Sequence, residues 1–355
     1  MFDRLADAFG WLQQALFESL IQPLVYALGL GGWTEDAFDA TGWLLVGLLQ
    51  IAVMLAVIGP LQRWRPVEPV RDRQAIRTDI LYTLIHRLGL FRLGLFFLVD
   101  PLFDELLGAL RGAGWGTLHL DQLWPGVTDV AWVSLLMYLV VLDFVEYLIH
   151  RGQHRWQWWW SLHSLHHSQR QMTMWSDNRN HLLDDLLHDA IIVGVAQLIG
   201  VAPGQFIAVV ALTQLSESLQ HANLRLSFGR WGERVWVSPA FHRTHHAIGI
   251  GHERRVAEAG AESTPGRPIA ASGGSGSSEA RAQARVEAPA LGGCNFGVLL
   301  PWWDLLFRSA DFSSRYPDTG IRDQVEPDAQ GRLRDYGRGF WAQQWRGLRR
   351  LAGRR

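Results

Sequence analysis

Long uncharged apolar runs alternate with polar, arginine-bearing segments along the first two thirds of the chain. Residues 43–61 (WLLVGLLQIAVMLAVIGPL) carry no charge over 19 residues, close to the ~20 residues that a helix needs to cross the ~30 Å hydrocarbon core of a bilayer. Residues 127–149 form a second such run, although Asp143 and Glu146 lie near its end. We therefore expect both segments to be helices that span a membrane.

Three further apolar segments are interrupted by polar or helix-breaking residues. Residues 9–30 fit a helix at the membrane interface as well as a spanning helix. Residues 78–110 predict one long tilted helix or a helical hairpin, because their charged side chains need protein on one side. Residues 186–219 are long enough for two helices, with Pro203 and Gly204 supplying the turn between them.

The arginines that follow the first predicted span set its orientation. Five arginines lie between residues 62 and 77, and such an excess beside a span normally stays in the cytoplasm. The N-terminus is then outside, and the histidine-rich stretches lie on the cytoplasmic face. The 18 tryptophans also favour a bilayer, since tryptophan is enriched at membrane interfaces, and we expect the four at 156 and 158–160 to anchor the chain there. We predict an integral protein of a bacterial inner membrane.

The overall charge gives no support for a nucleic-acid-binding protein, and the single cysteine gives none for a protein held together by disulfides. The 33 basic residues nearly balance the 34 acidic ones, so the composition gives no case for nucleic acid as a partner. Cys294 stands alone and cannot form an internal disulfide.

Residues 254–291 are rich in Ala, Gly, Ser, Pro and charge, with almost no large apolar residues, and predict a disordered insertion.

Histidines are concentrated in one part of the chain and follow short repeated patterns. Eleven of the 14 lie between His150 and His246. They form HxxxH at 150–154 and HxxHH at 163–167 and again at 242–246. On a helix, positions i, i+3 and i+4 share a face, so each motif can direct two or three imidazoles to one point. Eight such side chains suit two metal ions, although imidazole binds Fe, Zn, Cu and Ni alike.

A ligating ring usually donates its other N–H to a carboxylate or a carbonyl. Seven carboxylates near the histidine motifs are candidates for this role: Asp143, Glu146, Asp177, Asp184, Asp185, Asp189 and Glu217. A lone histidine is most often a helix cap or a satisfied core residue, but three clustered motifs make that reading a poor one here.

Four stretches, in the same order, resemble the fatty acid hydroxylase superfamily, which includes sterol desaturases, fatty acid hydroxylases and alkylglycerol monooxygenases. They are LDFVEYLIHRGQHRWQWWWSLHSLHHSQRQMTMWSDNRNHLLDD, QHANLRL, SPAFHRTHH and NFGVLLPWWDLLF, and they cover about residues 130–308. The resemblance implies an all-α, multi-pass membrane bundle with a cytosolic helical cap that carries a poly-histidine di-metal site. It divides the chain into an N-terminal membrane region (1–126), a catalytic domain (127–310) interrupted at 254–291, and an arginine-rich tail (311–355).

The resemblance also implies which side chains hold the metals. The nine implied ligands are His150, His154, His163, His166, His167, His221, His242, His245 and His246. Glu217 lies one turn before His221 and stands where some members carry another ligand. His181 follows Arg179 in a place where many relatives have RxHP, and it is either a ligand or a support for one; Asp143 and Glu146 are further candidates for support.

The superfamily's chemistry implies a function. Its members use a non-haem di-iron centre and O₂ to attack an unactivated C–H bond of a lipid. We expect a lipid hydroxylase that takes electrons from a separate reductase, ferredoxin or cytochrome, because the chain has no haem, flavin or cysteine-cluster motif. The lipid, the carbon attacked, the donor, the role of the 254–291 insertion and the oligomeric state stay open.

Three alternatives to hydroxylation differ in testable ways. A lipid desaturase would use the same ligands. A zinc hydrolase typically uses three protein ligands, fewer than this chain offers. A membrane protein that binds metal or haem without catalysis would hold one metal, or one haem, per chain and would consume no O₂.

Overall fold

The computed structural model describes residues 2–250, 293–313 and 316–354. Within these residues the regular structure is helical, with one isolated bridge between Ala247 and Thr319 and no strand. The predicted all-α class is therefore confirmed for the described part of the chain. The predicted insertion at 254–291 lies outside the described residues.

The N-terminal third is a series of helices joined by π turns and tight bends. Their bounds are α1 (Phe2–Leu16), η1 (Phe17–Ile21), α2 (Gln22–Ala27), η2 (Gly31–Trp33), α3 (Thr34–Val53), η3 (Met54–Ile58), α4 (Gly59–Trp64), α5 (Arg73–Arg87), α6 (Leu90–Leu98) and α7 (Asp100–Gly112). Elements η2 to α4 run on as one helix from Gly31 to Trp64. Pro60 lies two residues beyond the π turn, so the proline, which has no N–H to donate, coincides with an irregularity inside this helix.

The segment predicted as one tilted helix or a hairpin is divided into three helices. Asp72 caps α5 by accepting a hydrogen bond from the Ala75 N–H (2.9 Å). Gly89, with φ of 80°, follows the end of that helix and turns the chain into α6. The region is therefore not one long helix, and it has one helix more than a hairpin.

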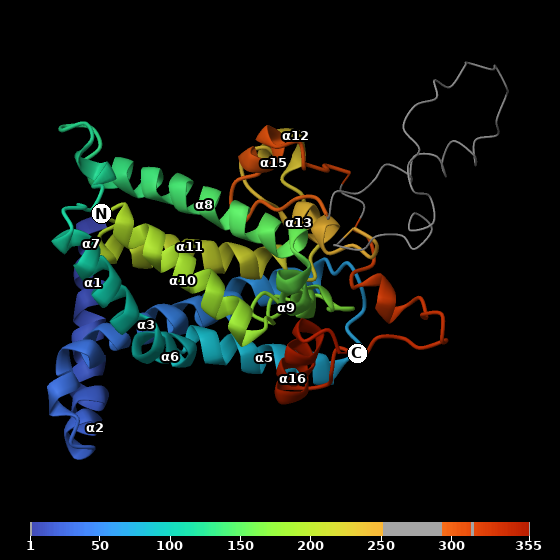
Figure 1. The fold of residues 1–355 in the computed structure, drawn as a ribbon, viewed down its shortest axis with the longest axis horizontal. Coiled ribbons are helices and arrows are strands. Elements are labelled where there is room, and N and C mark those ends of the chain that lie inside the picture. Colours follow the sequence, from blue (N-terminus) through green and yellow to red (C-terminus); the bar gives the residue numbers. More distant parts are fainter. Residues whose placement is uncertain (1, 251–292, 314–315, 355) are drawn as a thin grey trace.

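The remaining helices carry the histidine motifs. They are η4 (Leu120–Gln122), α8 (Ala131–Arg155), α9 (Gln157–His167), α10 (Leu182–Leu198), α11 (Pro203–Gln220), α12 (Gly229–Gly232), α13 (Pro239–His245), α15 (Trp302–Leu306), η6 (Arg322–Gln324) and α16 (Phe340–Leu351). The two helices predicted within 186–219 are present as α10 and α11. In Figure 1, α8, α10 and α11 lie alongside one another, and α9, α13 and α16 gather at one end of them.

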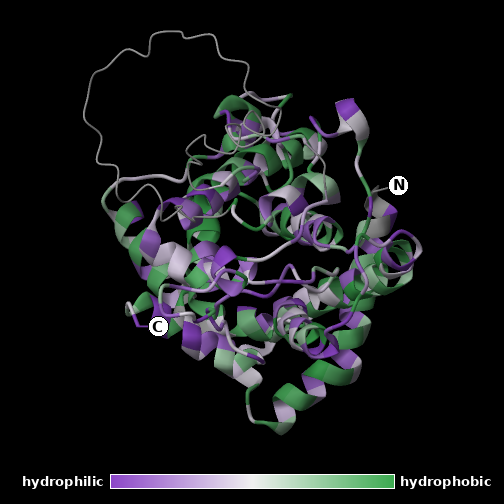
Figure 2. Cartoon of the chain, turned by 90° about the vertical axis from the view of Figure 1, so that its right-hand side faces the viewer, coloured by the Kyte–Doolittle hydropathy of each residue, from purple (hydrophilic) through white to green (hydrophobic). Residues whose placement is uncertain are grey.

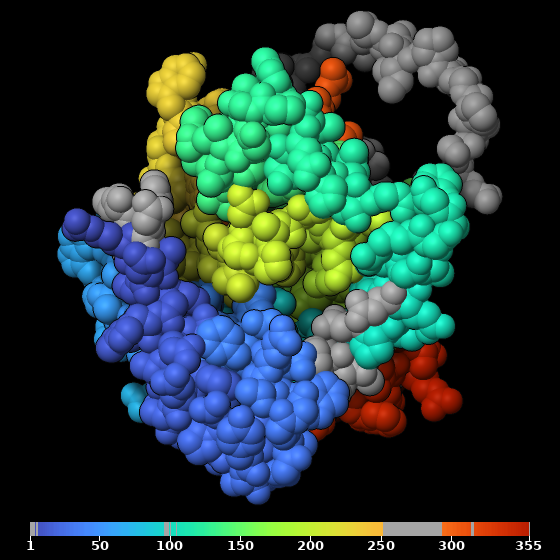
Figure 3. Space-filling view, turned by 90° about the vertical axis from the view of Figure 1, so that its left-hand side faces the viewer, coloured from blue at the N-terminus to red at the C-terminus, as the bar shows by residue number. Residues whose placement is uncertain are grey.

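Two helical stretches are long and apolar enough to cross a membrane: Gly31–Trp64 and Ala131–Arg155. The first contains the whole predicted span 43–61, and the second contains residues 131–149 of the predicted span 127–149. Large apolar side chains on their outer faces are exposed, including Leu49, Leu55 and Leu136. The opposite end from the histidine motifs is built from the N-terminal helices, residues around 110–130 and the α10–α11 turn (Figure 3).

Two apolar clusters fix these helices to the segments that carry the histidines. Leu139 and Leu142 of α8 pack with Leu299 and Leu300, which follow the residues 251–292 left undescribed. Met54 and Ile58, in the first candidate span, pack with residues 174, 222 and 224. The histidine-bearing end is therefore anchored to both long helices, and Figure 2 shows hydrophilic and hydrophobic segments mixed at this end.

The tryptophans at 156–160 differ in exposure. Trp156 and Trp158 are about half exposed, at 51% and 49%, and can serve as interface anchors. Trp159 and Trp160 are only 4% and 7% exposed. The prediction of an interface anchor is therefore wrong for these two residues. Trp160 packs against His154 and His167, and Trp159 packs with Ile149 and Ile192.

The close approach of α3 and α5 depends on Gly47. A Cβ at this position would collide with the backbone oxygen of Arg87. We expect Gly47→Ala to lower the free energy of unfolding by about 1–3 kcal/mol, as overpacking does, measured by chemical unfolding in detergent. Gly108→Ala is the matched control, because open space surrounds Gly108 in α7 and alanine there should stabilise by about 0.5–1 kcal/mol. Equal stability of the two variants would contradict this packing.

Candidate metal centre

Three helix ends bring the histidine motifs together. His150 and His154 occupy the last two turns of α8, and extended backbone at Trp156 (φ −102°, ψ 123°) redirects the chain into α9. Helix α9 then carries the first HxxHH motif in its last two turns. Ser238 caps α13 by accepting from the Phe241 N–H (3.1 Å), with Pro239 at the first helical position. This cap starts the short helix that carries the second HxxHH motif.

Eight histidines form two groups of four. In the His150 group and in the His166 group, one ring nitrogen from each residue lies within 4.8 Å of those of the other three. The His150 group contains His150, His154, His167 and His245; the His166 group contains His166, His221, His242 and His246. All eight are at most 8% exposed. Each group therefore directs four imidazoles at a common point.

The spacing within the groups is that of ligands around a metal ion. The Nε2 atom of His221 lies 3.1 Å from Nε2 of His166 and 3.1 Å from Nε2 of His242. In the other group, Nε2 of His245 lies 3.1 Å from Nε2 of His167. Nitrogens bound tetrahedrally at ~2.1 Å from one ion lie roughly 3.4 Å apart. The residues present thus fit two metal ions.

Backbone carbonyls hold three of the rings by their other nitrogen. Nδ1 of His150 donates to the Phe296 carbonyl (2.9 Å), and Nδ1 of His245 donates to the Cys294 carbonyl (2.6 Å). Nδ1 of His221 donates to the carbonyl of Glu217, one turn earlier in α11 (2.9 Å). These bonds select the tautomer that leaves Nε2 able to bind a metal.

Asn295, the first residue of the stretch NFGVLLPWWDLLF (the closing motif), lies between the two residues whose carbonyls hold His245 and His150. It adopts a left-handed backbone conformation (φ 57°) and is fully buried. Its side-chain amide donates to the carbonyls of Phe241 and Asp311, at 2.9 Å each. Asparagine tolerates this conformation better than most residues. Carboxylates or carbonyls were expected as supports, but the sequence did not identify these particular carbonyls, for which the NFG motif was the one signal.

His163 lies beside the His150 group but outside its four atoms. Its ring centroid is 5.3 Å from that of His150 and 5.2 Å from that of His154. Nδ1 donates to Asp184 (3.1 Å), while Nε2 is buried without a hydrogen bond among the described residues. Asp184 also accepts from Gln153 (2.9 Å) and Trp159 (2.6 Å). Asp184 is one of the seven carboxylates near the histidine motifs, and it supports a histidine, as was expected of some of these carboxylates.

Burial keeps the imidazoles neutral. It lowers the pKa of His166, His167, His242 and His246 well below the ordinary value, and neighbouring imidazoles lower it further. It also lowers the pKa of His245 to about 3. Neutral imidazole is the form that binds metals. A dry cluster of neutral rings is costly for a protein unless something binds the lone pairs they direct at one another.

The remaining candidates lie elsewhere. His181 caps α10 by accepting from the Leu183 N–H (3.1 Å) and donates from Nε2 to the Gln344 carbonyl (2.9 Å), so it faces α16 and belongs to neither group. Asp143 accepts from the backbone N–H of Leu299 (2.8 Å). It therefore supports the closing motif and not a histidine ring.

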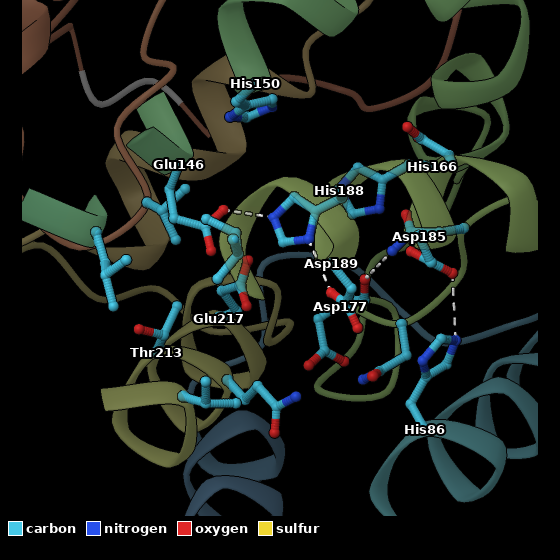
Figure 4. Close-up of a pocket in the computed structure, with 18 of the residues that line it drawn as sticks. His86, Glu146, His150, His166, Asp177, Asp185, His188, Asp189, Thr213 and Glu217 are labelled. Atoms are coloured by element: carbon cyan, nitrogen blue, oxygen red, sulfur yellow. Dashed lines mark hydrogen bonds and ion pairs between the residues drawn. The ribbon is translucent and has the colours of Figure 1, made fainter. Parts of the chain in front are cut away.

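A cavity of about 170 Å³, with both charged and apolar walls, adjoins the two groups. Its lining includes His166, His221 and His242 of one group and His150 of the other. Figure 4 shows that Glu146 and Glu217 face it from one side. Glu146 pairs with His188, which also bonds Asp189 (3.0 Å). Further out, His86 pairs with Asp185 (3.3 Å) and Arg87 with Asp177 (2.8 Å).

Comparison with known proteins agrees with this geometry. Residues 135–253 match the family described as fatty acid hydroxylase. These residues therefore form a fatty acid hydroxylase domain, in agreement with the resemblance of the histidine motifs to that superfamily. The matched residues include every member of both histidine groups, so the two groups lie within the hydroxylase domain.

Two similar proteins are named as a hydroxylase and a monooxygenase. The chain is 25% identical over 235 residues to ornithine lipid hydroxylase OlsE of Rhizobium tropici, covering 66% of this chain and 69% of that protein. It is 27% identical over 135 residues to alkylglycerol monooxygenase of Caenorhabditis elegans, covering 37% of this chain and 25% of that protein. No solved structure matches.

His163 is one of the ligands that the resemblance implies, and it lies beside His150 and His154. We therefore expect Asp184→Asn to weaken metal binding by about 10- to 100-fold, because the amide is a poorer acceptor for His163 than a carboxylate. The measurement is the metal retained by purified protein against a competing chelator. Asp328→Asn, in an exposed turn where Asp328 pairs with Arg332 (3.2 Å), is the control and should retain metal like the wild type. Unchanged affinity in Asp184→Asn would exclude a supporting role for this carboxylate.

Proposed function

We propose that this protein is a membrane-embedded di-iron oxygenase that hydroxylates an unactivated C–H bond of a lipid, using O₂ and electrons from a separate donor. The observation that carries the proposal is the pair of four-histidine groups within a hydroxylase domain. The two candidate spans, Gly31–Trp64 and Ala131–Arg155, would lie in a bacterial inner membrane with the histidines facing the cytoplasm.

The two groups are close enough for two metals to act together. Adjacent histidines send their rings to different groups: His166 and His246 belong to one, and His167 and His245 to the other. The rings of His167 and His246 stack across the two groups, with centroids 4.3 Å apart. Two iron ions held here would supply the redox chemistry with O₂ that no side chain offers.

The chain's own residues would orient the substrate and exclude water. Nine buried histidines, the Asp184 carboxylate and the backbone of the closing motif leave little room for solvent at the centre. The reaction requires a C–H bond, O₂, two electrons and two protons, and it yields a C–OH group and water. A lipid reaches the centre from the bilayer along the exposed apolar faces of the long helices.

Hydroxylation is favoured over its alternatives. Both relatives are named for adding oxygen, one as a hydroxylase and the other as a monooxygenase. A desaturase would use the same histidines, and its product would lack the added oxygen. A protein that only binds one metal or haem does not call for two four-histidine groups side by side.

The cavity beside the centre favours a lipid with a polar, cationic head. The Glu217 carboxylate faces the cavity and makes no hydrogen bond within the described part of the chain. Asp177, 8% exposed, has one carboxylate oxygen without a hydrogen-bond partner among those residues. One relative is named for a lipid of ornithine, an amino acid with an amine on its side chain. We infer that an amino group of the substrate lies near these carboxylates.

Expression of the chain in a bacterium that makes amino lipids should yield a lipid heavier by one oxygen atom. Under ¹⁸O₂ that oxygen should carry the label, as mass spectrometry of extracted lipids would reveal. The matched control, His166→Ala, removes one ring from its group and should give no product. A product that has lost two hydrogens and gained no label would instead identify a desaturase.

Burial, together with the nearby carboxylates of Glu146 and Asp177, raises the pKa of Glu217 to about 8, so this group is ionised at neutral pH only when a cation lies beside it. Glu217→Gln removes the carboxyl group from the cavity at nearly constant shape. For an amino-lipid substrate we expect KM to rise about tenfold or more, because a charge-assisted hydrogen bond is worth roughly 1.5–3 kcal/mol, with kcat less affected. The comparison variant is Asp189→Asn, because Asp189 is hydrogen-bonded to His188. An unchanged KM together with loss of iron would show that Glu217 binds metal.

A further inference from the structure

A second cavity, of about 570 Å³, lies beside α16 and is lined mainly by arginines. Seven arginines outnumber four carboxylates along its walls. The arginines are Arg322, Arg332, Arg334, Arg346, Arg349, Arg350 and Arg354. Both the C-terminal helix and residues 321–335 contribute to the lining, so the cavity is built largely from the segment beyond the histidine motifs.

Arg350 lines this cavity, and its side chain is buried. It is 8% exposed, and its Nε donates to the Ser161 carbonyl of α9 (3.0 Å). Its two terminal nitrogens are buried and make no hydrogen bond within the described part of the chain. Its guanidinium lies over the ring of Tyr336, with Cζ 4.6 Å from the centroid. Burial lowers its pKa to about 10, so it stays charged at neutral pH and offers two N–H groups to an anion.

Trp160 connects the same cavity to the histidines. Its ring lines the cavity and is 7% exposed. The centroid of the ring lies 5.0 Å from that of His154 and 5.3 Å from that of His167, both members of the His150 group. One aromatic side chain therefore separates an electropositive surface from the candidate metal centre.

We propose that this cavity is the docking surface for an acidic one-electron carrier protein, and that Trp160 bridges the carrier and the centre. The proposal rests on the proposed function, which needs two electrons per turnover. Each reduced carrier would give up one electron and one ferric ion would become ferrous, so two carriers serve one turnover. Carboxylates on the carrier would pair with the arginines, and complementary charge of this kind raises association rates in weak, transient complexes.

The observations favour a protein over a lipid surface as the occupant. Carboxylates alternate with the arginines: Asp323 pairs with Arg334 (3.4 Å) and Asp335 with Arg346 (2.6 Å). An anionic bilayer would be repelled by these carboxylates, whereas a protein surface can match a mixed pattern. The contact of Trp160 with two candidate ligands also has no use in lipid binding.

The binding test uses the full chain in detergent and a plant-type [2Fe–2S] ferredoxin, an acidic one-electron carrier. Arg346→Glu combined with Arg354→Glu should raise the Kd for ferredoxin about tenfold or more, through reversed charges at the rim, and should reduce its dependence on salt. Arg230→Glu combined with Arg234→Glu is the matched control on exposed arginines outside the cavity, and it should leave the Kd unchanged.

The electron-transfer test follows reduction of the oxidised centre by stopped-flow absorbance. Trp160→Leu should slow reduction by ferredoxin about tenfold or more at unchanged ferredoxin Kd and iron content, and should leave reduction by dithionite unaffected, since dithionite needs no docking. Trp158→Leu, in the same helix but half exposed, should behave like the wild type. Equal slowing with both reductants would show that Trp160 only supports the ligands.

Three results would overturn the docking surface. One is equal weakening by the cavity variant and the control variant, which would indicate unspecific attraction. The second is an unchanged ferredoxin Kd with lost binding to phosphatidylglycerol vesicles, which would assign the arginines to lipid. The third is a Kd that no variant alters. Absence of iron from the wild type would instead contradict the proposed function, and the binding test does not depend on iron.

Discussion

The structure depends on holding eight buried, neutral imidazoles with their lone pairs directed at two points. Such a cluster costs free energy unless metals bind it, so the surroundings must keep each ring in place. The carbonyls of Cys294 and Phe296 hold two rings, and Asp184 holds the neighbouring His163. The extended backbone at Trp156 and the cap at Ser238 make the helix ends meet.

The division of neighbouring histidines between the two groups has a functional consequence. Because His166 and His167 direct their rings to different groups, the two points share one helix and move together. The cavity that holds Glu217 is lined by three histidines of the His166 group and by His150. The arginine-lined cavity shares no lining residue with it and reaches the His150 group through Trp160. In this account, substrate and electrons approach a pair of metals from different sides, and neither blocks the path of the other.

The sequence predicted the elements better than their meeting points. Apolar runs predicted both long helices. The prediction that each motif directs its rings to one point holds for His150 with His154 and for His242 with His246, but it is wrong for the motif at 163–167, whose rings are divided. The assignment of each ring to a group could not be predicted, because it depends on how three helix ends pack. His181 has a ligand-like place in the sequence, yet Gly347 in α16 brings a backbone against its ring. The pairing of Glu146 with His188 likewise joins residues 42 positions apart.

Iron content with Mössbauer spectroscopy of ⁵⁷Fe-labelled, detergent-purified protein tests the central claim most directly. The account predicts two irons per chain in a magnetically coupled pair. The pair should be lost in His166→Ala and retained in His181→Ala, since His181 belongs to neither group. One metal per chain, or a metal content that does not depend on His166, would contradict the account and favour a metal-binding protein without oxygenase chemistry.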